Sequence, residues 1–118
     1  MADVVQKSFD SPDEVRTFPL GNVKLLNHAD GVVGLGTFEP GWRWSEHLQP
    51  IVQTPSCQAN HTGYVVSGRA TVLMDDGQEF NLKPGDFFVV PGGHDAWTVG
   101  DEPCVMVDWQ GLRDYAKG

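Results

Sequence analysis

Short runs of β-branched and aromatic residues, separated by turn-forming residues, repeat through most of the sequence. Glycine and proline account for 14 and 8 of the 118 residues, and they lie between these runs instead of collecting in one segment. The pattern is typical of an all-β domain. So many short strands in one small domain must hide their edges, which favours a barrel or a jelly roll. The expected strands are Val23–Asn27, Val32–Phe38, Trp42–His47, Gly63–Ser67, Ala70–Met74, Glu79–Leu82, Phe87–Val90, Ala96–Val99 and Val105–Trp109.

The segments around these strands predict the rest of the organisation. Asp75-Asp76-Gly77 favours a tight hairpin, because its glycine supplies a positive φ. Phe87–Val90 is wholly apolar, which predicts a strand covered on both faces. Residues 49–60 contain two prolines and predict a long loop. Ser11-Pro12-Asp13-Glu14 resembles a helix start, limited to a turn or two. We expect one domain, with an N-terminal arm over residues 1–20 and a barrel over residues 21–118.

Composition and charge exclude several classes of partner. The formal net charge is −8 and the sequence pI is about 4.7, with no run of Lys or Arg. A nucleic acid or an anionic membrane needs a basic face, so neither is expected as a partner. No apolar stretch approaches the roughly 20 residues of a membrane helix, and the first ten residues lack the features of a signal peptide. We therefore expect a soluble, cytoplasmic protein whose two cysteines are thiols or metal ligands.

Three of the four histidines lie at the ends of expected strands. His47 ends one strand, His61 precedes another, and His94 follows the apolar strand after a Pro-Gly-Gly bend, whereas His28 in a turn predicts an ordinary surface residue. Strand ends can converge at the mouth of a barrel. Residues i and i+2 share one face of a strand, so an inward His47 brings Arg43 with it as an anchor for a carboxylate.

Cys57 stands four residues before His61, a spacing that lets one metal contact both side chains. A thiolate with imidazoles suits zinc or iron far better than magnesium or calcium. The alternative is a small buried thiol beside a loop histidine, since free cysteine is among the most buried residue types.

At this point the chain resembles the cupins, small β-barrels of the jelly-roll type, over about residues 20–110. The second cupin motif resembles residues 84–97, where Gly85 is followed by five residues, Pro91 and the bend before His94. In the first motif, Gly41 and His47 match its beginning, and His61 occupies the usual glutamate position.

The chain also departs from the cupin pattern. The second ligand position of the first motif falls on Cys57 when counted back from His61, and on Gln49 when counted forward from His47; we prefer the thiolate of Cys57. Ala96 occupies the usual histidine position of the second motif, and His94 lies two residues earlier on the same strand face.

The cupin resemblance implies one divalent transition metal, held by His47, Cys57, His61 and His94. Zinc or iron is favoured, with nickel and manganese as further cupin metals. With an open coordination position, the resemblance implies dioxygenase-like or isomerase-like chemistry on a small organic acid bound by Arg43. The alternative is a non-catalytic ligand-binding or sensor module with a structural zinc or no metal. We expect a homodimer, because Trp42 and Trp44 alternate with the inward face and would point outward.

Overall fold

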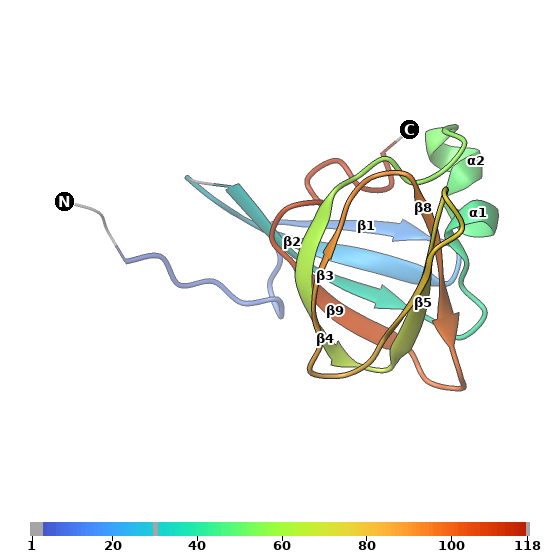
Figure 1. Ribbon diagram of the computed structural model, residues 1–118. Helices are drawn as coiled ribbons and strands as arrows, with labels where there is room; N and C mark the ends of the chain where they lie inside the picture. The colour runs from blue at the N-terminus through green and yellow to red at the C-terminus, as the bar shows by residue number, and fades with distance from the viewer. Residues whose placement is uncertain (1–3, 30, 118) are drawn as a thin grey trace.

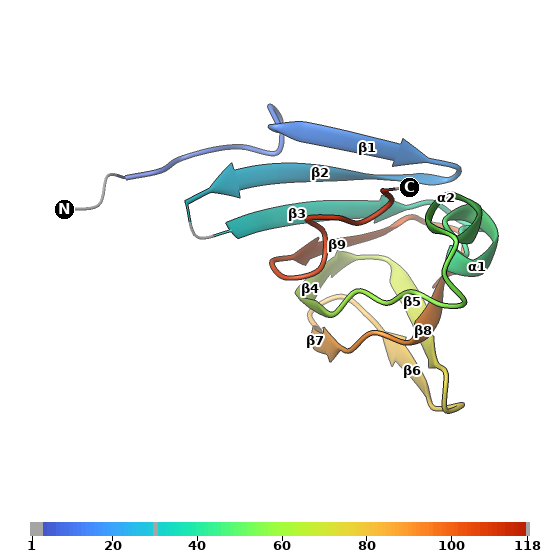
Figure 2. The ribbon, with the colours of Figure 1, turned by 90° about the horizontal axis from the view of Figure 1, so that it is seen from above.

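Two β-sheets face each other in the computed structural model, which describes residues 4–29 and 31–117 (Figures 1 and 2). The larger sheet has the strand order β1-β2-β3-β9-β4-β7, and the smaller one has the order β6-β5-β8. The named strand neighbours all pair antiparallel. The strands are β1 (Glu14–Phe18), β2 (Gly21–His28), β3 (Gly31–Phe38), β4 (His61–Ser67), β5 (Arg69–Met74), β6 (Glu79–Leu82), β7 (Phe87–Val90), β8 (His94–Val99) and β9 (Cys104–Asp108).

The all-β prediction is confirmed, and eight of the nine expected strands overlap observed ones. The Asp-Asp-Gly hairpin joins β5 to β6, with Gly77 at φ 95°. The expectation that β7 is covered on both faces is wrong. Phe88 and Val90 are buried, whereas Phe87 and Val89 are 63% and 64% exposed, because β7 is the edge strand and packs only its inner face.

Two local predictions are wrong. Glu14–Phe18 forms strand β1, not a helix, because it pairs along β2 and its Phe18 packs against Phe38 and Trp42. The expected strand Trp42–His47 is instead helix α1 (Trp44–His47), followed by helix α2 (Gln49–Val52) in the predicted loop. The Asp95 carboxylate of β8 accepts hydrogen bonds from the Ser45 N–H and hydroxyl, which stabilises the first turn of α1.

The helix changes where the tryptophans point. Trp42 and Trp44 are 4% and 3% exposed, and Trp42 packs 4.4 Å from Phe38 between ring centroids. The prediction that they form an exposed apolar patch is therefore wrong, since both belong to the core. Among the described residues, no helix has the length and the apolar run needed to cross a membrane.

The helices and the C-terminal segment, residues 110–117, lie at the same end of the two sheets (Figure 1). Leu112 and Tyr115 of this segment are buried in the cluster that contains Phe18 and Phe38. Arg16 of β1 holds the segment in place. Its guanidinium donates hydrogen bonds to the carbonyl oxygens of Leu112, Arg113 and Tyr115, at 3.1, 2.6 and 2.8 Å. One side chain near the start of the chain therefore fixes the segment that covers this end of the barrel.

Candidate metal centre

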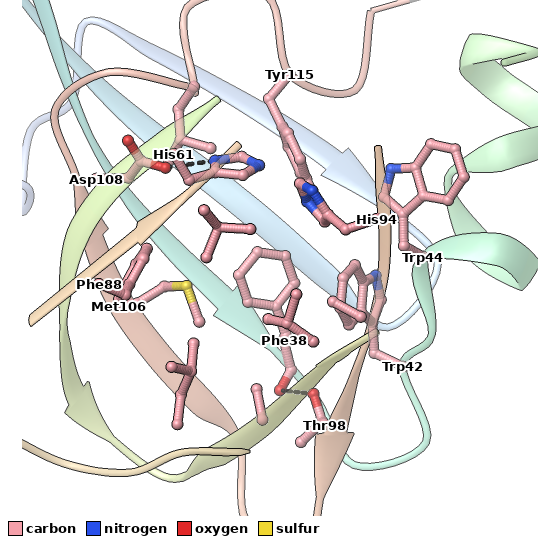
Figure 3. Close-up of a pocket in the computed structure, with 16 residues that line it drawn as sticks. Phe38, Trp42, Trp44, His61, Phe88, His94, Thr98, Met106, Asp108 and Tyr115 are labelled. Carbon is pink, nitrogen blue, oxygen red and sulfur yellow. Dashed lines mark hydrogen bonds and ion pairs between the residues drawn. The ribbon is translucent and has the colours of Figure 1, made fainter. Parts of the chain in front are cut away.

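Three potential ligand atoms meet beneath the C-terminal segment. They belong to Cys57, His61 and His94, and all lie within 4.8 Å of one another. Cys57 Sγ is 3.7 Å from His61 Nε2, and the two imidazole ring centroids are 5.3 Å apart. Figure 3 shows the two histidines at the same end of the barrel interior.

Backbone structure brings the three residues together. His61 is the first residue of β4 and His94 the first residue of β8. Cys57 lies in the loop before β4, and an isolated antiparallel bridge ties it to His94: the Cys57 N–H donates to the His94 carbonyl at 2.8 Å, and the Gly93 N–H donates to the Cys57 carbonyl at 2.7 Å. The position of Cys57 therefore depends on main-chain bonds.

Each histidine also has a partner for its second ring nitrogen. His61 Nδ1 lies 2.6 Å from Oδ2 of Asp108, a side chain that is 2% exposed, and His94 Nδ1 lies 2.8 Å from the Pro91 carbonyl oxygen. Both carboxylate and carbonyl accept a hydrogen bond, so Nδ1 carries the proton in each ring. Nε2 is then the nitrogen available to a metal, an arrangement that orients metal-binding histidines in proteins.

Charge is concentrated in this cluster. Burial opposes ionisation of Cys57, but hydrogen bonds from His61 and His94 outweigh it and lower the pKa of the thiol to about 6. Burial likewise disfavours a charged His61, but its hydrogen bonds to Asp108 and Cys57 raise its pKa to about 9. The pKa of Asp108 is lowered, because the hydrogen bond from His61 outweighs its burial. Without a metal, the group is a thiolate, an imidazolium and a carboxylate in a row.

The cluster separates two spaces. His61 and His94 line a cavity of about 50 Å³ inside the barrel, whose other walls are mostly apolar (Figure 3). Cys57 instead lines an outer groove of about 750 Å³ that runs along the C-terminal segment. Trp44 and Tyr115 border both spaces. A centre at this position would therefore lie between the outer groove, lined by Cys57, and the inner cavity, lined by the two histidines.

The structure does not bring His47 or Arg43 into this group. His47 lies on α1, and its Nδ1 contacts the backbone of Arg43, which supplies an N–H at 3.0 Å. The Arg43 guanidinium lies 4.2 Å from the ring centroid of Trp97 and pairs with Asp95 at 3.3 Å, and Arg43 lines neither the cavity nor the groove. Gln49, the alternative to Cys57, donates hydrogen bonds to loop carbonyls at 3.1 and 3.3 Å.

Two residues of the site were not recognised from the sequence. Asp108 is the last residue of β9 and follows an apolar run, and a lone carboxylate at the end of such a strand is a signal that could have marked it. Its Oδ1 also accepts the N–H groups of Gln110 and Gly111, both at 2.8 Å. Tyr115 carries no comparable signal, because its place depends on how the last residues fold back over the barrel.

The donor set fits a transition metal. A thiolate and two neutral imidazoles bind zinc at about 2.3 and 2.0–2.1 Å, which puts tetrahedral ligand atoms roughly 3.5 Å apart. The 3.7 Å between Cys57 and His61 already matches this spacing, and the largest separation in the cluster, within 4.8 Å, needs a movement on the order of 1 Å. Metal binding would displace the proton that lies between Cys57 Sγ and His61 Nε2.

Comparisons with solved structures place this site in a known fold. KdgF from a Halomonas species is 26% identical, with 81% of this chain and 83% of that chain covered and a TM-score of 0.58. The polyketide cyclase RemF from Streptomyces resistomycificus is 16% identical, with 94% and 81% covered and a TM-score of 0.66. A conserved protein with a double-stranded beta-helix domain from Klebsiella pneumoniae is 20% identical, with 92% and 90% covered and a TM-score of 0.60. The last two likenesses show the fold alone.

Sequence comparison with curated proteins gives no match. The family model for the cupin domain, by contrast, matches residues 35–110, which include β4 to β9 and all three residues of the cluster. Two facing sheets of antiparallel strands, with histidines at the strand ends of one barrel mouth, agree with that match. The chain belongs to the cupin family.

Proposed function

We propose that this protein binds one transition metal ion through Cys57, His61 and His94 and presents it to a small organic ligand. The observation that carries the proposal is the convergence of three donor atoms whose two imidazoles are already oriented by Asp108 and Pro91. Structural zinc sites use four protein ligands, whereas catalytic sites use three and keep a position for water or substrate. Three protein donors therefore favour a centre that binds a ligand.

The donor chemistry favours zinc or iron, because sulfur with imidazole is a poorer match for manganese. Such an ion supplies Lewis acidity to an oxygen bound at its open position. The chain's own residues prepare the centre. Asp108 keeps the proton of His61 on Nδ1, and Cys57 is held as a thiolate. Trp44 and Tyr115, which border both the groove and the cavity, would limit access of water to the centre.

A small organic acid would reach the centre from the outer groove, which is lined by Cys57 and by several polar residues. Arg43 is left out of this proposal, because its guanidinium already engages Asp95 and Trp97. Dioxygenase-like or isomerase-like turnover is one use of an open position. The other is a sensor module, in which ligand binding at a zinc ion has no chemical consequence.

Elemental analysis of protein purified without an affinity tag tests the proposal. We expect close to one zinc or iron per chain, and much lower occupancy in Cys57→Ser, His61→Ala and His94→Ala. His47→Ala is the matched control and should keep its metal, because His47 lies outside the cluster. Full occupancy in the three cluster variants would overturn the proposal. Iron with oxygen consumption would favour the dioxygenase, whereas tightly held zinc without turnover would favour the sensor.

We also propose that two copies associate through the outer face of β4 and β7. Tyr64, Val66, Phe87 and Val89 are between 45% and 64% exposed there, and Phe87 stacks on the half-exposed Trp109 at 6.1 Å between ring centroids. None of these side chains is charged, in a chain whose net charge is −8. Exposed aromatic patches of this kind are typical of interface cores.

A further inference from the structure

Two hydrogen-bonding side chains of the outer groove make no contact of that kind with the part of the chain that the structure describes. They are the Tyr115 hydroxyl and the Arg113 guanidinium, and both residues belong to the C-terminal segment that forms one wall of the groove. The groove, at about 750 Å³, lies within the range of about 300–1,000 Å³ that is usual for small-molecule sites. The inner cavity, at about 50 Å³, does not. The outer groove is therefore the space in which these two groups can meet a ligand.

Tyr115 is a buried residue whose hydroxyl is still accessible. The residue is 8% exposed, and its hydroxyl is not among the fully enclosed polar atoms without a partner. Its ring extends toward the histidines and meets His61 edge-on, with centroids 5.7 Å apart (Figure 3). Burial and the charges of Cys57 and Asp108 raise the pKa of Tyr115 well above its ordinary value, so the hydroxyl stays protonated. Since buried polar groups rarely lack a partner, this donor beside Cys57 indicates an acceptor that a ligand supplies.

Arg113 carries the positive charge of the groove that no acidic side chain compensates. Its exposed guanidinium has no ion pair among residues 4–29 and 31–117, although acidic residues outnumber basic ones by 16 to 8. Lys117, the other basic residue of the groove, pairs with Asp114 at 3.3 Å. The main chain of Arg113 is held in place, because the Arg16 guanidinium donates to its carbonyl oxygen at 2.6 Å. A guanidinium in this situation suits a carboxylate, which it can bind through two parallel hydrogen bonds.

The two groups call for different ligand oxygens. Arg113 is exposed and positively charged, so it favours a carboxylate. Tyr115 lies near the negative charges of Cys57 and Asp108, which would repel a carboxylate and admit a neutral oxygen. Because the two residues are two positions apart in the chain, a short organic acid can contact both.

We propose that the outer groove binds a small keto acid, whose carboxylate is held by Arg113 and whose carbonyl oxygen accepts a hydrogen bond from the Tyr115 hydroxyl. The inference rests on the proposed function in one respect: the carbonyl end of the ligand is the end that would reach the candidate metal centre. It adds the chemical class of the ligand and the two residues that select it.

Levulinate, pentanoate and methyl levulinate are matched probes for this site. Levulinate carries both the ketone and the carboxylate, pentanoate lacks the ketone, and methyl levulinate lacks the charge. Binding to the protein as purified is measured by ligand-observed NMR and by isothermal titration. We expect levulinate to bind more tightly than either of the other two, because only levulinate satisfies both donors.

Two conservative variants assign each contact separately. Arg113→Gln should weaken levulinate and pentanoate by about tenfold and leave methyl levulinate unchanged, since only the first two carry a charge. Tyr115→Phe should weaken levulinate and methyl levulinate by about fivefold, the effect of one neutral hydrogen bond, and leave pentanoate unchanged. Arg43→Gln and Tyr64→Phe are the matched controls and should change none of the three affinities, because neither residue lines the groove.

Three results would overturn the proposal: levulinate binding no more tightly than pentanoate, either variant weakening all three probes equally, or a control variant weakening levulinate as much as Arg113→Gln does. Metal content, measured on the same samples, separates this inference from the proposed function. Absence of the expected pattern in protein that holds its metal through Cys57, His61 and His94 refutes the keto-acid site alone. The expected pattern in protein without metal supports the keto-acid site and refutes the metal centre.

Discussion

Asp108→Asn is the substitution that best tests how the candidate centre is held. Asparagine has the same shape, and its side-chain oxygen can still accept the N–H groups of Gln110 and Gly111 that Asp108 Oδ1 accepts at 2.8 Å. What is lost is the carboxylate oxygen that accepts the His61 Nδ1 proton at 2.6 Å, together with its negative charge, because the amide NH2 group takes the place of Oδ2. The variant therefore changes the orientation and the charge of His61 but leaves the turn that follows β9 with its hydrogen bonds.

The size of the effect follows from the charge on His61. Its pKa is about 9, against 6.5 for an ordinary histidine, and at 1.36 kcal/mol per pKa unit its buried partners stabilise the metal-free fold by about 3 kcal/mol. Because the folded pKa is the higher one, this stabilisation is complete below pH 6.5 and is lost as pH rises through about 9. A charge-assisted hydrogen bond accounts for about 1.5–3 kcal/mol of it.

Urea unfolding of metal-free protein from pH 6 to pH 10 measures this directly. We expect Asp108→Asn to lose about 2 kcal/mol at pH 6 and much less at pH 10. Metal affinity should fall about tenfold to a hundredfold, as it does when the partner of a ligating histidine is removed. Asp101→Asn, at an exposed position, is the control and should change neither quantity. A loss of stability that is equal at pH 6 and pH 10 would refute the reasoning.

Three further outcomes are expected. Gly63→Ala should destabilise the fold by about 3 kcal/mol in urea unfolding, because a Cβ there would overlap the Val107 carbonyl oxygen of the neighbouring strand; a neutral result would mean that β4 and β9 can separate. Burial raises the pKa of Cys104 to about 11, so stability should fall from pH 9 to pH 11 by up to about 3 kcal/mol as the unfolded thiol ionises, and Cys104→Val should remove that part of the decline. Phe87→Ser combined with Val89→Ser should convert the dimer into monomers in light scattering at micromolar concentration; a wild-type monomer would refute the proposed interface.

The strands were largely predictable, because their signals are local. Alternation and turn residues mark β5 and β6 with the hairpin between them, and the observed bounds differ from the expected ones by two residues or fewer in the eight strands that were foreseen. The two failures depend on distant parts of the chain. β1 exists because β2 offers it an edge and Phe18 finds aromatic partners, and α1 forms where Asp95 of β8 accepts its N-terminal hydrogen bonds.

The candidate site was predictable in part for the same reason. Cys57 and His61 are close in sequence, and the bend before His94 is a recognisable motif. The position of His47 depended on treating its segment as a strand, and a helix turns the residue toward its own backbone. Asp108 lies 47 residues from His61, and only the register between β4 and β9 brings them together.

The main-chain bridge between Cys57 and His94 has a consequence for how such a centre can change during evolution. The bonds that hold the loop use the N–H and carbonyl of residue 57, and any amino acid except proline supplies both. A single codon change there can therefore exchange sulfur for oxygen or nitrogen as the third donor while the loop stays in place. A substitution at position 57 can therefore change which metal the site prefers while the fold of the barrel stays the same.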